Sequence, residues 1–132
     1  MNVIVPRAIA AGLFFLAIFV TGFWLSRLGR PYSGLLFSLH KLIALAALVF
    51  LGVMLVRAQR PNPLDALQLA AIVVSGLCFI VTILTGGLGS LEGDTARLLQ
   101  RIHQFMPYAT VLSSAAALYL VLAAKGVTAL IP

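Results

Sequence analysis

Charged residues are scarce in this sequence. Only nine Lys and Arg and three Asp and Glu occur among 132 residues, 62% of which are hydrophobic. A soluble domain carries roughly 25% charged residues, and so few charges cannot cover the surface of a soluble globule of this size. The composition therefore excludes a soluble cytosolic enzyme, a nucleic-acid-binding module and a disordered segment, and it predicts an integral membrane protein.

Cysteine and acidic residues are also nearly absent. The single cysteine, Cys78, excludes an internal disulfide. The three acids are Asp65, Glu92 and Asp94, and none lies within a long apolar run, so a carboxylate relay for protons is not expected. The net charge of +6 comes from basic residues near the ends of these runs, which anionic lipid headgroups explain better than nucleic acid does.

Four long apolar runs fill most of the chain. Each is near the ~20 residues that a helix needs to cross the hydrocarbon layer, and a helix satisfies its own backbone amides there. We expect helices over residues 6–27, 34–57, 64–88 and 95–124, with Asp65 as a cap and a turn at Asn62-Pro63. Because the connections are short, the sequence predicts an all-α fold over residues 1–132, a single integral membrane domain built as a four-helix up-down-up-down bundle.

The only two histidines are expected at the same depth in the membrane. His40 lies early in the second predicted helix and His103 early in the fourth, and these helices run parallel in such a bundle. Ionisable groups within membrane helices are costly and usually serve a function. Two facing imidazoles suit the two axial positions of one haem, so His40 and His103 are the predicted iron ligands. The alternatives are packing or headgroup contact, or another ligand such as copper or a quinone.

Residues near the histidines are expected to make room for a haem and to balance its charge. The small residues that would allow close approach of the macrocycle are Gly86, Thr110 and Ser114. The basic residues that would bind the propionates are Arg27, Arg30, Lys41, Arg97 and Arg101. Plain helix packing is the alternative for the small residues, and lipid anchoring is the alternative for the basic cluster.

Short motifs around both histidines resemble those of a known family. Leu39-His40-Lys41-Leu42 opens the second predicted helix, Arg101-Ile102-His103-Gln104 with Pro107 lies in the fourth, and Thr85-Gly86-Gly87 ends the third. Together they look like the small four-helix b-type cytochromes of bacterial membranes. The resemblance implies one haem b with His40 and His103 as axial ligands, electron transfer with a quinone or another redox partner, and a place in the bacterial inner membrane.

The sequence also departs from that family. Many such cytochromes hold two haems with four histidines, and the second pair is missing here. One haem near one membrane face cannot carry electrons across the whole bilayer, so we expect exchange with a quinone or a redox partner protein on one side. The chain would act alone, as a homo-oligomer or within a larger membrane complex.

Two other functions stay open. The chain could be a cofactor-free structural or assembly subunit of a membrane complex. It could also be a small transporter subunit, although Lys41 is the only Lys, Arg, Asp or Glu within the four long apolar runs, and ion-coupled carriers usually need more. If the protein is an enzyme, we expect an oxidoreductase component rather than a hydrolase, since no Ser-His-Asp arrangement is apparent.

Overall fold

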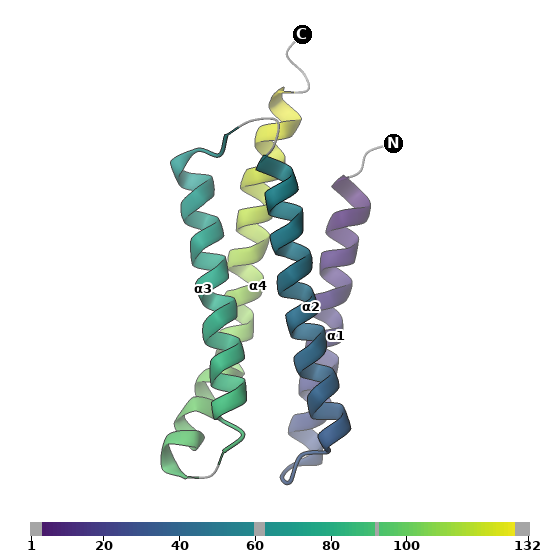
Figure 1. The fold of residues 1–132 in the computed structure, drawn as a ribbon, viewed down its shortest axis with the longest axis vertical. Helices are drawn as coiled ribbons and strands as arrows, with labels where there is room; N and C mark the ends of the chain where they lie inside the picture. The colour runs from purple at the N-terminus through teal and green to yellow at the C-terminus, as the bar shows by residue number, and fades with distance from the viewer. Residues whose placement is uncertain (1–3, 60–62, 92, 129–132) are drawn as a thin grey trace. The chain divides into compact units, whose positions relative to one another are not determined.

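Four helices make up the fold. The computed structural model describes residues 4–59, 63–91 and 93–128, and these form α-helices, turns and short connections without a strand. The helices are α1 (Ile4–Leu28), α2 (Gly34–Gln59), α3 (Ala66–Leu88) and α4 (Asp94–Thr128) (Figure 1). Each contains a segment long and apolar enough to cross a membrane. The predicted all-α class with four transmembrane helices is confirmed, and the chain is an integral membrane protein by this criterion.

Helix α3 begins two residues later than predicted, because Asp65 is its N-cap. The Asp65 carboxylate accepts a hydrogen bond from the backbone N–H of Gln68 at 2.8 Å. The Gln68 side-chain oxygen in turn accepts from the backbone N–H of Asp65 at 3.2 Å. This capping box satisfies two amides that the helix itself leaves unpaired, so the predicted cap at Asp65 is confirmed.

The start of α2 and the end of α3 are as predicted, and the remaining helix ends differ from the predictions by a few residues. Helix α1 ends at Leu28 because Gly29 takes a positive φ of 70°, a conformation that favours glycine. Helix α4 continues to Thr128, past the predicted end at residue 124. The predicted turn at Asn62-Pro63 cannot be compared, since Asn62 lies outside the described residues.

The chain divides into two compact units, Met1–Arg57 and Ala58–Pro132. The first contains α1 and all but the last two residues of α2, and the second contains α3 and α4; each pair of helices is an antiparallel hairpin (Figure 1). In the α1–α2 hairpin the rings of Phe14 and Phe50 meet with their centroids 5.4 Å apart. In the α3–α4 hairpin the two helices pack closely, and the hydroxyls of Ser75 and Ser114 and of Thr82 and Thr110 meet between them. The single domain predicted for residues 1–132 stays a prediction.

Candidate functional site

His40 projects from α2 toward α1, where its ring lies beside the side chain of Thr21. Its Nδ1 lies 2.8 Å from the hydroxyl oxygen of Thr21, which lies 2.7 Å from the carbonyl oxygen of Ala17. A threonine hydroxyl has one proton, and a carbonyl oxygen can only accept. Thr21 therefore donates its proton to Ala17 and accepts a hydrogen bond from the Nδ1–H of His40. A neutral His40 then carries its lone pair on Nε2.

His103 is held in the same tautomer by a different acceptor. Its Nδ1 lies 2.8 Å from the carbonyl oxygen of Thr82 in α3, and only a protonated Nδ1 can donate to a carbonyl. The Thr85 hydroxyl lies farther from this nitrogen, at 3.4 Å, and donates to the carbonyl of Val81 at 2.7 Å. Thr82 is therefore the main partner of Nδ1, and a neutral His103 also carries its lone pair on Nε2.

A glycine lies beside each imidazole ring. A Cβ atom added at Gly22 would lie 3.1 Å from Cε1 of His40. One added at Gly86 would lie only 2.6 Å from Cε1 of His103, closer than Cβ contacts occur in proteins. Gly86, a predicted site residue, therefore gives His103 the room for its position. Its predicted contact with a cofactor stays a prediction.

The two hairpins share a sequence repeat. In α1 the repeat contains Gly12-Leu13, Phe15 and Thr21-Gly22. The corresponding residues in α3 are Gly76-Leu77, Phe79 and Thr85-Gly86. Residues that correspond between α2 and α4 are Leu35-Leu36 and Leu98-Leu99, and His40 and His103. Thr21 and His40 are 19 residues apart, and Thr85 and His103 are 18 residues apart. Each hairpin thus brings one imidazole to a Thr-Gly pair, as expected of a parallel repeat.

This repeat identifies residues that the sequence analysis missed. Gly86 and the two histidines were predicted site residues, but Thr21 and Gly22 were not. Aligning the two halves of the chain would have paired Thr21-Gly22 with Thr85-Gly86 and pointed to both positions. The partner of His103 is a backbone carbonyl, at Thr82, and no side-chain pattern could have indicated it.

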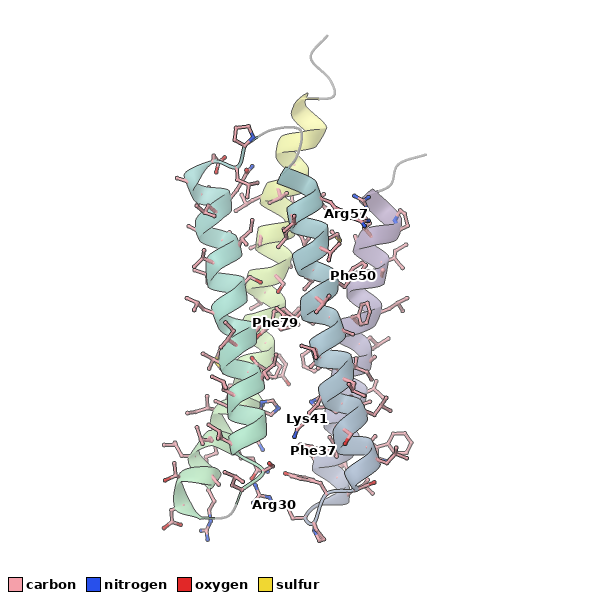
Figure 2. The ribbon with its side chains drawn as sticks, viewed as in Figure 1. Arg30, Phe37, Lys41, Phe50, Arg57 and Phe79 are labelled. Atoms are coloured by element: carbon pink, nitrogen blue, oxygen red, sulfur yellow. The ribbon has the colours of Figure 1, made fainter. Side chains whose placement is uncertain are left out.

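Three of the predicted basic residues lie in the α1–α2 hairpin, each over an aromatic ring. The pairs, with the distance from the charged group to the ring centroid, are Arg27 and Phe23 at 4.9 Å, Arg30 and Tyr32 at 5.6 Å, and Lys41 and Phe37 at 3.9 Å. Figure 2 shows Lys41 and Phe37 near the first end of α2 and Arg57 at the opposite end. These cation–π contacts keep the three cations near the α1–α2 connection, beside the His40 end of α2.

The other two basic residues, Arg97 and Arg101, lie in α4 and are exposed. Arg97 is 3.8 Å from the carboxylate of Asp94, and both side chains are more than four-fifths exposed, so this ion pair contributes little to stability. The predicted contact of the five basic residues with propionates stays a prediction.

Thr110 and Ser114, two further predicted site residues, are hydrogen-bonded to α3. The hydroxyl oxygens of Thr110 and Thr82 are 2.8 Å apart, as are those of Ser114 and Ser75. Farther along, the Gln68 amide donates to the carbonyl of Leu120 at 3.3 Å. Ser75 and Ser114 are both buried, so these bonds hold α3 against α4 where no water competes.

We expect the Ser75–Ser114 hydrogen bond to stabilise the α3–α4 hairpin modestly. In a double-mutant cycle of Ser75→Ala and Ser114→Ala, the coupling free energy should be about 0.6 kcal/mol, the average for interhelical hydrogen bonds in membranes. Unfolding of the detergent-solubilised protein measures it. Ser113→Ala is the matched control, because the Ser113 hydroxyl donates only within α4, to Thr110, and should show no coupling to Ser75→Ala. A coupling near zero for Ser75 and Ser114 would contradict the expectation.

The donors of the described residues limit which metal group the chain could bind. In residues 4–59, 63–91 and 93–128 no three His, Cys, Asp or Glu gather into a group that could hold a bare metal ion. A haem requires only axial ligands from the protein, since its porphyrin supplies four nitrogens. Each hairpin offers one imidazole of the kind that binds haem iron, and the predicted haem with His40 and His103 as its ligands stays a prediction.

No protein-family model matches the chain, and comparison with curated proteins and with solved structures finds no match. The resemblance of the His40 and His103 motifs to b-type cytochromes is therefore untested by these comparisons and stays a prediction.

Proposed function

We propose that this chain is a membrane-embedded electron-transfer protein that binds one haem b through Nε2 of His40 and Nε2 of His103. The observation that supports the proposal is the hydrogen bond at each Nδ1, to the Thr21 hydroxyl and to the Thr82 carbonyl. Metal-binding histidines usually donate their other ring N–H in this way, which fixes the tautomer and orients the ring. The same arrangement occurs once in each repeat.

A haem held by His40 and His103 would supply one-electron chemistry at its iron. The protein contributes orientation and environment. His40 and His103 are each anchored to the neighbouring helix of their own hairpin, so neither ring can rotate without breaking a hydrogen bond. The apolar helices exclude water, and Arg27, Arg30 and Lys41 offer positive charge for the propionates.

The kind of redox partner that we propose is inferred from the presence of a single pair of histidines. With one haem near one membrane face, electrons would be exchanged on that face with a quinone or a redox protein. We place the chain in the bacterial inner membrane, alone, as a homo-oligomer or as a subunit of a larger complex, on the strength of the motif resemblance. If the protein takes part in an enzyme, it does so as an oxidoreductase component.

A cofactor-free structural subunit is the second candidate. The hydrogen bonds at Nδ1 of His40 and His103 favour it in one respect, since they would satisfy half-buried imidazoles without any ligand. This candidate expects both histidines to be replaceable without loss of folding or of partner binding, and no haem spectrum.

Visible spectroscopy separates the two candidates. The protein is purified in detergent with haem supplied during expression, and its absorption is recorded before and after reduction. We expect haem bands that sharpen and shift on reduction, with one haem per chain, and their loss in the His40→Ala, His103→Ala double variant. Circular dichroism and size-exclusion chromatography check that this variant folds. Identical spectra for wild type and double variant would show that the proposal is wrong.

A further inference from the structure

We propose that one face of α1 binds an anionic phospholipid, with the lipid phosphate at Arg27 and one acyl chain along Val20, Phe23 and Trp24. These four residues line a shallow groove on the surface of α1. They follow one another at intervals of three, one and three residues, which places them on one face of the helix. The site is formed by α1 alone and does not depend on haem binding, so the inference goes beyond the proposed function.

The apolar part of the groove suits an acyl chain. Val20 is 50%, Phe23 62% and Trp24 57% exposed, and all three lie in a helix apolar enough to cross a membrane. Tryptophan is typical of the boundary between hydrocarbon and headgroups, because its ring has an apolar body and a polar N–H. A lipid whose chain lies along these side chains would therefore have its headgroup near the end of α1 at Leu28.

Arg27 points back along α1 rather than out of the membrane. Its guanidinium lies 4.9 Å from the centroid of the Phe23 ring, one turn nearer the middle of the span Pro6–Leu28. Lys41 shows the opposite arrangement, because its ammonium lies over Phe37, one turn nearer the start of α2 and thus nearer the membrane face. Both directions follow from the lean of helical side chains toward the N-terminus of their helix, since α1 runs toward this face and α2 away from it.

A cation that points toward hydrocarbon needs an anion nearby. Its removal from water costs free energy unless it is paired, and a cation–π contact offsets only part of that cost. No Asp or Glu precedes Asp65 in the sequence, so the α1–α2 hairpin has no carboxylate of its own for Arg27. A lipid phosphate is available at this depth of the membrane, and a guanidinium can donate two parallel hydrogen bonds to it.

The charge of the α1–α2 connection favours an anionic lipid over a zwitterionic one. Arg27, Arg30 and Lys41 lie near this connection, and they repel the ammonium group of a zwitterionic headgroup. One basic residue near an anionic membrane surface strengthens the attraction about fivefold. We therefore expect phosphatidylglycerol to be enriched about fivefold over phosphatidylcholine beside the groove. With Arg27 bound to a lipid, Arg30 and Lys41 remain for the propionates of a haem.

Trp24 allows a direct test, because it is the only tryptophan of the chain and its fluorescence reports which lipid lies in the groove. The haem-free protein is reconstituted in mixed vesicles of phosphatidylcholine and phosphatidylglycerol, with the quencher bromine on the acyl chains of one lipid or the other. We expect brominated phosphatidylglycerol to quench Trp24 as strongly as about fivefold more brominated phosphatidylcholine does. Equal quenching by the two lipids would overturn the inference. Quenching by neither would also overturn it, since protein would then cover Trp24.

Substitutions of basic residues test whether Arg27 holds the lipid. Arg27→Gln should remove the preference for phosphatidylglycerol, and Arg27→Lys, which keeps the charge, should retain most of it. Arg57→Gln is the distant control, because Arg57 lies at the opposite end of α2 (Figure 2), and it should keep the preference. Lys41→Gln removes a charge near the α1–α2 connection and should lower the preference less than Arg27→Gln does. An equal effect of these two would assign the preference to diffuse charge and overturn the inference.

Inorganic phosphate separates a lipid site from a site for the free ion. Added to the vesicles, it should lower the preference no more than chloride does at the same ionic strength, because it has no acyl chain to lie in the groove. A loss specific to phosphate would indicate a site for the free ion and overturn the inference. None of these measurements involves haem, so their failure would leave the proposed function standing, and a protein that binds no haem would leave the lipid site standing.

Discussion

Replacing either histidine alone should remove all of the bound haem rather than half of it. If one haem takes an axial ligand from each hairpin, His40→Ala and His103→Ala each leave a single imidazole to hold it. Losing an outer-shell partner already costs about 10- to 100-fold in metal affinity, so losing a ligand should lower haem affinity by more than about 100-fold. Haem titration of the two single variants measures the loss, and the haem-to-chain ratio of the purified proteins gives a second reading.

Two neighbouring substitutions are suitable controls for this experiment. Ser38→Ala and Gln104→Ala lie within two residues of His40 and His103 on the same helices, and both side chains are exposed. Each should bind haem as wild type does. A single histidine variant that keeps half of the haem would mean that each hairpin binds its own haem, which contradicts the shared site.

Gly86→Ala should displace His103 and weaken haem binding. The added Cβ would lie 2.6 Å from Cε1 of the ring, so the imidazole must move from the position that its bond to Thr82 defines. We expect haem affinity to fall about 10- to 100-fold, the range for lost outer-shell support of a metal ligand. The overpacking should cost about 1–3 kcal/mol of stability, more than the roughly 1 kcal/mol that alanine gains over glycine in a helix.

A second glycine of α3 provides the matched control for that variant. A Cβ atom at Gly76 would meet nothing within 4 Å, so Gly76→Ala should keep haem binding and be at least as stable as wild type. Gly22→Ala, with its contact of 3.1 Å to His40, should fall between the two. Haem titration and thermal unfolding in detergent check all three. Wild-type haem binding by Gly86→Ala would show that the position of His103 has no bearing on the cofactor.

The helices were predictable because lipid leaves the backbone little choice. Apolar runs of about twenty residues must satisfy their own amides, and this requirement alone indicates four helices. The ends depend on local chemistry instead. Asp65 was recognised as a cap, yet the predicted helix began one residue before it, because apolar periodicity does not mark where helical hydrogen bonding begins.

The candidate site was only partly predictable. His40 and His103 were identifiable because an imidazole is rare within an apolar run. Thr21 was not, because a threonine in such a run has the same appearance whether it contacts a histidine or only its own helix. The hydroxyl of Thr110, a predicted site residue, is hydrogen-bonded to Thr82 of α3, and its predicted contact with a cofactor stays a prediction. Tertiary contacts, which composition does not encode, decide between these roles.

The correspondence between the two hairpins bears on how such a protein could have arisen. One hairpin with a histidine beside a Thr-Gly pair carries a single ligand, so an ancestral protein of that size would have needed two identical copies to hold a haem from both sides. Joining the copies in one gene frees each half to mutate separately. The hydroxyl oxygen of Thr21 lies 2.8 Å from Nδ1 of His40 and that of Thr85 lies 3.4 Å from Nδ1 of His103, so the two halves of this chain differ in detail.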